Sequence, residues 1–339
     1  MGSEPRDAKR SWLQGSLIFI SAIFITTLTL IGSAGTSAAS FGYPERPVRF
    51  IIGFPPGGAP DLTARVVGQA LSEAWGQPVI VDSRVGAAGN IAASNAAKST
   101  PDGYTLLLSG DAAMTTNVSL YEKLPYEPLR DFKPITLATT ATNVLVVHPS
   151  VPARNLQELI VLAKSQPGKL SYASAGSGTS QHLAGELLKS MAGIEIVHVP
   201  YRGATFILDV LAGRVPIGFP NTVISLSYLN DGKLRGLAVT SLKRSAILPE
   251  VPTLSESGHS GFEAIAWFGL LAPAGTPDVI VRQVHRDTLK VLASADVRSR
   301  LAGAGLEIVG SSPGEFAARI KEEILRKGRL IKASGAKPD

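Results

Sequence analysis

The stretch Val48-Arg49-Phe50-Ile51-Ile52-Gly53-Phe54-Pro55-Pro56-Gly57-Gly58 decides the fold, because an apolar strand ends there in a glycine-rich turn. The turn opens a helix that we expect over residues 61–75. The same order returns next, with a strand at 79–81, the turn Gly86-Ala87-Ala88-Gly89 and a helix over 90–98. Short apolar strands that alternate with helices predict parallel sheets covered by helices on both faces.

The pattern restarts after a link near residues 131–134 and continues as strands and helices to residue 239. An expected strand at 265–271 then leads to helices at 277–292, 295–302 and 313–333. We therefore expect an α/β fold of two lobes, each a mainly parallel sheet flanked by helices. Lobe 1 is expected to hold residues 40–140 and 265–339, and lobe 2 residues 141–264.

The composition excludes several classes of protein. Of the 339 residues 45% are hydrophobic and 18% charged, which excludes global disorder. The net charge of +6 is too small and too scattered for a nucleic-acid-binding protein. The chain has no cysteine, which excludes disulfides, thiolate metal sites and cysteine catalysis.

The first 39 residues are typical of a cleaved secretory signal peptide. Arg6, Lys9 and Arg10 precede an apolar run over 17–31, and small residues follow at 33–39. The alternative is an uncleaved anchor helix, for which the run of about 15 residues is short. Because a lipid-modified cysteine is impossible, we expect a mature protein that is free in the periplasm.

Three glycine-rich turns between a strand and a helix are the candidate ligand sites. Helix N-termini at the carboxyl ends of strands offer unpaired N–H groups that suit anions. The alternative is that such turns only reverse the chain. The candidate residues are Phe54, Pro55, Pro56, Gly57 and Gly58 in the first turn, Gly86, Ala87, Ala88, Gly89 and Asn90 in the second, and Ser174, Ala175, Gly176, Ser177, Gly178 and Thr179 in the third.

Polar residues near these turns have two interpretations each. Asp61 either caps its helix or meets ligand, and His182 either contacts ligand or packs and caps locally. Arg202, after Tyr201, either pairs with a carboxylate or is solvated. The sequence lacks the G-x-S-x-G and P-loop motifs, and its five histidines form no close ligand pair. We therefore expect no enzyme activity, no cofactor and no metal.

These stretches together resemble the tripartite tricarboxylate transporter substrate-binding proteins, the Bug family. The resemblance covers residues 43–335 and its motifs follow in order. They include Tyr43-Pro44-Glu45-Arg46-Pro47-Val48, Phe54-Pro55-Pro56-Gly57-Gly58, Pro101-Asp102-Gly103-Tyr104, His182-Leu183-Ala184-Gly185-Glu186, His198-Val199-Pro200-Tyr201-Arg202-Gly203 and Ala272-Pro273-Ala274-Gly275-Thr276-Pro277.

The resemblance implies a monomeric, two-lobed periplasmic binding protein of type II-like fold that closes on a small carboxylate in a cleft between its lobes. It also implies delivery to membrane subunits of a tripartite tricarboxylate-type transporter. There are two alternatives. One is an orphan member of the family that acts as a ligand sensor, and the other is an exported enzyme that acts on a carboxylate. Amino acids and aromatic acids remain open as ligands.

Two segments depart from the family pattern. Ser109-Gly110-Asp111 would bring a negative charge to the cleft, where Asp111 either faces an ammonium or other donor group of the ligand or points to solvent. The segment 219–224 also differs, and it is expected to build the third side of the pocket around Asn221. Of the properties that the family resemblance implies, the identity of the ligand is therefore the one that can least be carried over to this chain.

Overall fold

The computed structural model describes residues 1–2 and 42–338. The expected signal peptide therefore lies, from residue 3 onward, outside the described residues. The chain divides into two compact units, Met1–Tyr43 and Pro44–Asp339, and the second unit contains both sheets. No helix in the described part of the chain combines the length and the apolar character that crossing a membrane requires.

The first sheet has six strands, of which two come from near the C-terminus. Their order is β11-β4-β10-β3-β1-β2. The strands are β1 (Val48–Ile52), β2 (Val79–Ser83), β3 (Thr105–Gly110), β4 (Phe132–Ala141), β10 (Ala266–Pro273) and β11 (Leu306–Ile308). We call this sheet and the helices packed on it lobe 1.

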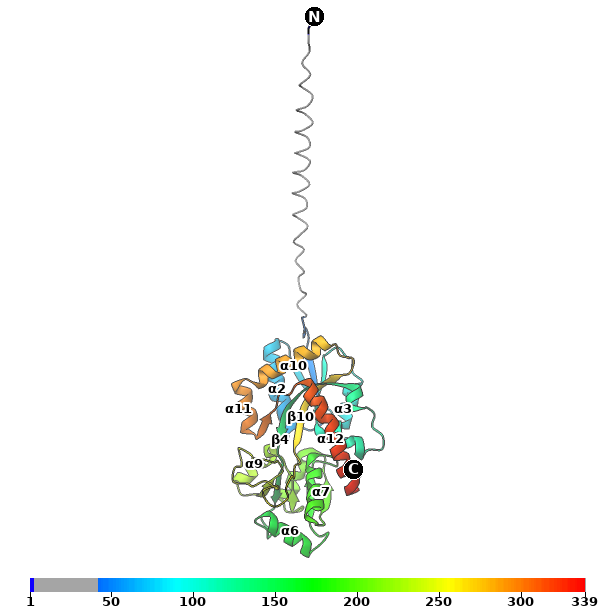
Figure 1. The fold of residues 1–339 in the computed structure, drawn as a ribbon. Helices are drawn as coiled ribbons and strands as arrows, with labels where there is room; N and C mark the ends of the chain where they lie inside the picture. The colour runs from blue at the N-terminus through cyan, green and yellow to red at the C-terminus, as the bar shows by residue number, and fades with distance from the viewer. Residues whose placement is uncertain (3–41, 339) are drawn as a thin grey trace. The chain divides into compact units, whose positions relative to one another are not determined.

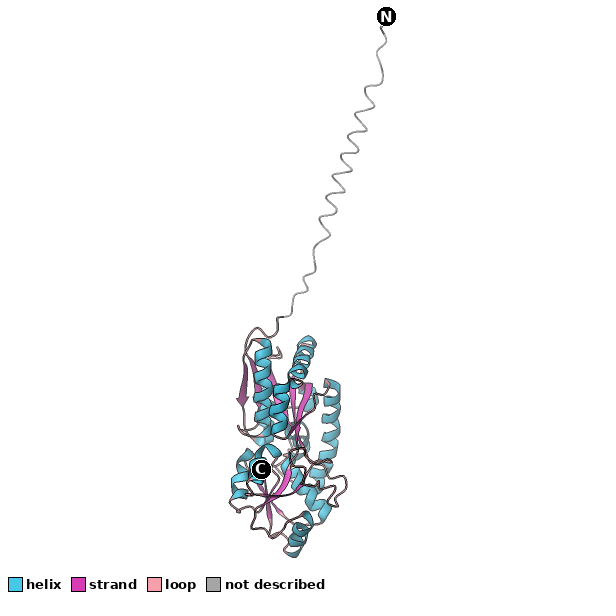
Figure 2. Ribbon diagram, turned by 90° about the vertical axis from the view of Figure 1, so that its left-hand side faces the viewer, coloured by secondary structure: helices cyan, strands magenta, loops and turns pink. Residues whose placement is uncertain are grey.

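Helices cover both faces of this sheet (Figures 1 and 2). Ile51 packs in a core cluster with residues of α3 and α12, whereas a Cβ built on Gly68 of α2 would meet Phe50. Because neighbouring strand residues point to opposite faces, α2 lies opposite to α3 and α12. The helices are α2 (Ala59–Trp75), α3 (Asn90–Ala97), α4 (Asn117–Leu120), α5 (Pro128–Asp131), α10 (Asp278–Leu292), α11 (Ala295–Gly303) and α12 (Pro313–Ser334), with short helical turns at Ala87–Gly89 and Ala112–Thr116.

The second sheet has five strands in the order β7-β6-β8-β5-β9. It forms lobe 2 with its own apolar core, which includes Leu145, Tyr172 and Phe219. The strands are β5 (Val144–Val147), β6 (Ser171–Ser174), β7 (Val197–Pro200), β8 (Ile217–Gly218) and β9 (Arg235–Val239). The helices are α6 (Leu156–Ser165), α7 (Ser180–Ala192), α8 (Phe206–Leu211) and α9 (Thr222–Asn230), with a short turn at Gly203–Thr205.

Both sheets are mixed, which corrects the expectation of mainly parallel sheets. In lobe 1, β1 runs parallel to β2 and β3, but β10 is antiparallel to β3 and β4, and β11 to β4. In lobe 2, β6 is parallel to β7 and β8, whereas β5 is antiparallel to β8 and β9. The reason lies in the path of the chain: β4 leads out toward lobe 2 and β10 returns from it, so they run in opposite directions.

The two passages between the lobes are joined by one buried asparagine. Asn143 donates from its side-chain amide to the Ala264 carbonyl (2.8 Å) and to the Ser180 hydroxyl (3.1 Å). Thr240 donates to the same carbonyl of Ala264 (2.9 Å). The outgoing and returning segments are thus tied together directly beside the start of α7. Our division of the chain at residues 140/141 and 264/265 stays a proposal.

Candidate functional site

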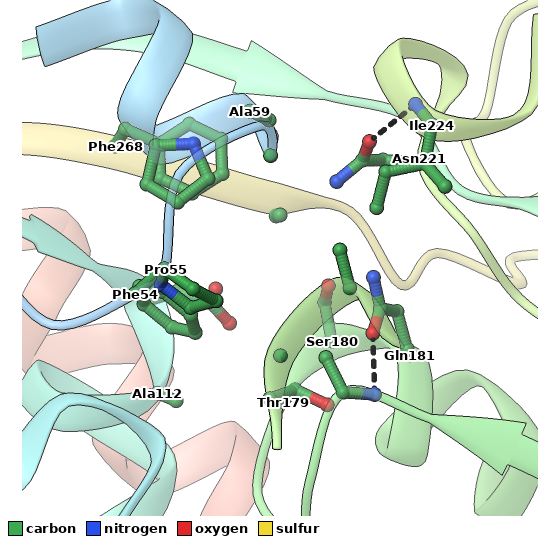
Figure 3. A pocket seen from close by; sticks show the side chains of 17 residues that line it. Phe54, Pro55, Ala59, Ala112, Thr179, Ser180, Gln181, Asn221, Ile224 and Phe268 are labelled. Carbon is green, nitrogen blue, oxygen red and sulfur yellow. Dashed lines mark hydrogen bonds between the residues drawn. The ribbon is translucent and has the colours of Figure 1, made fainter. Parts of the chain in front are cut away.

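A void of about 520 Å³, mouth included, lies between the two lobes (Figure 3). Most of the lining is apolar or backbone. Lobe 1 contributes Phe54, Pro55, Gly58, Ala59, Pro60, Asp111, Ala112, Ala266 and Phe268, and lobe 2 contributes Ala175, Thr179, Ser180, Gln181, Gly203, Ala204, Asn221 and Ile224.

Three helices begin at this void. Helix α2 starts after Gly58, α7 after Thr179 and α9 after Asn221, and all three of these N-cap residues line the void. The first turns of such helices carry backbone N–H groups without intrahelical partners and about half a positive charge. Their convergence from both lobes makes the void suited to an anion such as a carboxylate.

Two side-chain amides add donors whose direction is fixed. The Asn221 Oδ1 accepts from the backbone N–H of Ile224 (3.3 Å), and the Gln181 Oε1 accepts from the N–H of Ala175 (2.8 Å). Because each carbonyl oxygen is held by the backbone, each NH₂ group points away from it and into the void (Figure 3). Lobe 2 therefore presents neutral hydrogen-bond donors to an acceptor in the void.

Asp111 is the one charged residue among the described residues that line the void. The solvent-facing alternative is wrong, because Asp111 is only 4% exposed and forms an ion pair with Lys327 of α12, 2.5 Å away. Burial raises the pKa of Asp111 more than the Lys327 ammonium lowers it. Burial also opposes the charge of Lys327, but the carboxylates of Asp111 and Glu323 outweigh it and raise the Lys327 pKa.

The structure brings about half of the predicted residues to the void or its neighbour. Phe54, Pro55, Gly58, Asp111, Ala175, Thr179 and Asn221 line the void itself. A second void, of about 350 Å³ with its open mouth included, shares Phe54, Pro55, Ala175 and Gly203 with the first. The other predicted residues on its walls are Gly86, Ala87, Ala88, Gly176, Tyr201 and Arg202.

The second turn is held in a strained backbone conformation. Ala87 and Ala88 have φ of 47° and 48°, a left-handed region that costs an L-residue about 1–2 kcal/mol. The turn also packs closely on the first one, because a Cβ built on Gly53 would lie 2.5 Å from the Cα of Gly89. Strain of this kind tends to persist at functional sites, where surrounding structure enforces it.

The remaining predicted residues do not line either void. They are Pro56, Gly57, Asp61, Gly89, Asn90, Ser109, Ser174, Ser177, Gly178 and His182. Asp61 accepts from the Gly57 N–H (3.1 Å) and from the Arg65 Nε (2.8 Å), so it stabilises the first turn. Asn90 accepts from the hydroxyl of Tyr126 (2.6 Å) within lobe 1.

His182 and His198 hold the third turn in place through contacts with Gly178 and Ser174. The Gly178 N–H donates to the His182 Nδ1 (3.0 Å), and the two imidazoles stack with their centroids 4.2 Å apart. The His198 Nε2 lies 2.7 Å from the Ser174 hydroxyl. Burial, followed by the nearby His182 and Lys189, lowers the pKa of His198 to about 3, so this histidine is neutral at pH 7.

Sequence reasoning missed several lining residues. Ser180 and Gln181 directly follow the third predicted turn and lie in the first turn of α7. Their position next to that turn in the sequence could have marked them as lining residues. Phe268 lies in the middle of β10, and Ile224 in the first turn of α9. Nothing in the local sequence marks these two positions. No group of three or more acidic, histidine or cysteine side chains in the described part of the chain is placed to hold a metal.

Two α/β lobes with a void between them, at which helix N-termini converge, define the class of periplasmic binding proteins. Residues 63–336 match the family described as tripartite tricarboxylate transporter family receptor, and the chain belongs to this family. It is 36% identical over 323 residues to Protein BugT of Bordetella pertussis, covering 95% of this chain and 98% of that protein.

Solved structures agree with this assignment. Rpa4515 of R. palustris with adipate is 36% identical, with a TM-score of 0.84 over 88% of this chain and 100% of that one. The periplasmic binding protein BugD is 33% identical, with a TM-score of 0.82 over 88% of this chain and 100% of BugD. MatC of Rhodopseudomonas palustris with bound malate is 30% identical, with a TM-score of 0.80 over 85% of this chain and 100% of MatC. The two-lobed α/β fold and the family inferred from the sequence are thereby confirmed, and the mainly parallel strand direction is the part of the expected fold that is corrected.

Proposed function

We propose that the protein is a periplasmic solute-binding protein that captures a small carboxylate between its lobes and delivers it to a tripartite tricarboxylate-type transporter. The observation that carries this proposal is the convergence on one void of three helix N-termini and of two side-chain amides whose NH₂ groups point into it. The relatives Rpa4515 and MatC, with adipate and malate, support a carboxylate as the ligand.

The energetics require both lobes to take part. One exposed helix N-terminus stabilises an anion by about 0.3–1 kcal/mol, and a partly buried one by up to about 2 kcal/mol. A micromolar dissociation constant corresponds to about 8 kcal/mol. Three termini, the Asn221 and Gln181 amides and the exclusion of water must therefore act together. That combination exists only where lobe 1 and lobe 2 both contact the ligand, so binding favours the closed form.

The N-terminal sequence supports export. We infer that residues 1–39 are removed and that the mature protein works in the periplasm, as BugD does. Intact mass measured on protein from a periplasmic extract tests this inference: a chain that starts near residue 40 supports it, and an uncleaved chain in the membrane fraction contradicts it.

The binding experiment combines a ligand screen with a charge substitution. Mono-, di- and tricarboxylates, aromatic acids and amino acids are screened by thermal shift, because a ligand that binds only the folded state raises Tm. The hits are then titrated by calorimetry into wild type and Asn221→Asp. Aspartate keeps the N-cap acceptor for Ile224 but replaces the NH₂ donor by a negative oxygen, so we expect affinity to fall by about 100-fold or more.

The matched control is Asn155→Asp, at the N-cap of α6, where Oδ1 accepts from the Glu158 N–H (2.9 Å). Asn155 does not line the void, so its variant should bind ligand as wild type does. If no carboxylate raises Tm at millimolar concentration, or if both variants bind equally, the proposal is refuted. Ligand recovered unchanged after long incubation distinguishes binding from turnover.

A further inference from the structure

The buried ion pair at the wall of the void carries information about the ligand beyond the proposed function, on which it rests. Asp111 follows strand β3 in lobe 1, and Lys327 lies on α12, 216 residues further along the chain. Both side chains are almost fully buried, with 6% and 8% of their surfaces exposed. Asp111 lines the void, whereas Lys327 does not.

Lys327 has no N–H group left for a ligand. Its ammonium lies 2.5 Å from the Asp111 Oδ2, 2.8 Å from the Glu323 Oε2 and 3.3 Å from the Thr115 hydroxyl. An ammonium has three donors, and these contacts use all of them. The cation therefore orients Asp111 without itself offering a donor to the void.

Glu323 fixes the far side of this cluster. It accepts from the Trp267 Nε1 (2.9 Å) and from the Arg319 Nε (3.0 Å), in addition to its ion pair with Lys327. Arg326 also lies 3.7 Å from the Glu323 Oε1 and pairs with Glu263 (3.4 Å). Three carboxylates thus face three cations, and the cluster needs no further charge. A ligand carboxylate placed beside Asp111 would add a negative charge without a free cation to balance it.

Asp111 keeps acceptor capacity that the protein does not use. An ionised carboxylate has about four lone-pair positions, of which Lys327 occupies one and the backbone N–H of Asp111 itself another. When the lobes close and exclude water, the group best suited to the remaining positions is a donor on the ligand. Leaving a buried acceptor without a partner would instead cost binding free energy.

We propose that the cleft selects a carboxylate whose other end carries a hydrogen-bond donor, a hydroxyl or an ammonium that faces Asp111, and rejects a second carboxylate at that position. The ligand carboxylate lies at the helix N-termini and the amides of Asn221 and Gln181. Asp111 is then the residue that separates this chain's ligand from a simple dicarboxylate.

The test compares ligands of equal carbon number by calorimetry at pH 7.5. The panel is 4-hydroxybutyrate, 4-aminobutyrate and succinate, and 6-hydroxyhexanoate, 6-aminohexanoate and adipate. Wild type should bind the hydroxy or amino acid of at least one length at least tenfold more tightly than the dicarboxylate. Asp111→Asn keeps an acceptor for Lys327 and adds an N–H toward the void, so it should remove or invert this preference.

A second variant guards against misfolding of the first. Asp111→Asn combined with Lys327→Met removes both charges of the pair and should also lose the preference, with unfolding curves recorded for each protein. A wild-type preference for the dicarboxylates, or a preference for donors that the variants retain, overturns the inference and leaves the proposed function intact. If carboxylates outside this panel also fail to bind wild type, the proposed function fails and the inference with it.

Discussion

Replacing Gly203 by alanine should weaken ligand binding by holding the lobes apart. Gly203 belongs to lobe 2, and a Cβ built on it would lie 2.5 Å from the Cγ and 2.8 Å from the Cδ of Pro55 in lobe 1. Ordinary contacts of a Cβ begin near 3.4 Å, so the closed form would have to open by about 0.9 Å at this point. Both residues line the void, so closure brings them together where ligand is held.

The size of the effect follows from the overlap. Forcing an extra methyl group into a packed contact costs about 1–3 kcal/mol. With a tenfold change in Kd for each 1.4 kcal/mol, we expect affinity to fall by roughly 5- to 150-fold. Gly203 also has φ of 75°, and alanine there costs about 1–2 kcal/mol of folding stability. That strain exists in the open and closed forms alike, so it lowers the free energy of unfolding rather than the affinity.

Calorimetry with a ligand from the screen measures the loss, and Gly193→Ala is the matched control. Gly193 lies in the same lobe with φ of 61°, but a Cβ there would have no atom within 4 Å. Pro55→Ala removes the two atoms that the new methyl group meets, so it should restore much of the affinity in the double variant. Equal affinities for the Gly203 and Gly193 variants, or no recovery in the double variant, would refute the reasoning.

Two further predictions concern stability. His198 has an ordinary pKa of 6.5 when unfolded and about 3 when folded, so the unfolded chain binds more protons between these values and stability falls as pH drops from 6.5 toward 3. Urea unfolding should show up to about 1.4 kcal/mol lost per pH unit from this group, and a slope unchanged in His198→Asn would contradict the assignment. A Cβ on Gly269 would lie 2.1 Å from the Cζ of Phe316, so Gly269→Ala should lower the free energy of unfolding by about 3 kcal/mol. Gly314→Ala, with open space around it, is the control, and similar melting temperatures for both variants would rule out this packing argument.

Local patterns predicted the elements and the turns well. The helix expected over 61–75 is found at Ala59–Trp75, where Gly58 ends the turn and Pro60 fits the first helical turn. The helix expected over 90–98 is found at Asn90–Ala97. These features depend on hydrophobic spacing and on glycine and proline, which a sequence shows directly.

Strand direction and the charged cluster could not be predicted in this way. The antiparallel pairing of β10 with β4 depends on where the chain returns from lobe 2, and a run of apolar residues carries no direction. Asp111 looked like an isolated charge because its partner Lys327 is 216 residues away. The role of Gln181 depends on the Ala175 N–H that orients its amide, which is a tertiary contact.

Lobe 2 leaves and rejoins lobe 1 at one point, because Ala141 at the end of β4 is the register partner of Ala266 at the start of β10. Two connecting segments that lie side by side form a hinge. Such a hinge permits rotation of one lobe against the other about one short axis but resists sliding and twisting of the lobes. The side-chain amide of Asn143 joins the two connecting segments beside that axis, through its hydrogen bond to the Ala264 carbonyl. The distance between the ligand-binding turns of the two lobes is therefore set by a hinge only a few residues wide. Removing the Asn143 side-chain amide should broaden the range of angles between the lobes that the ligand-free protein samples.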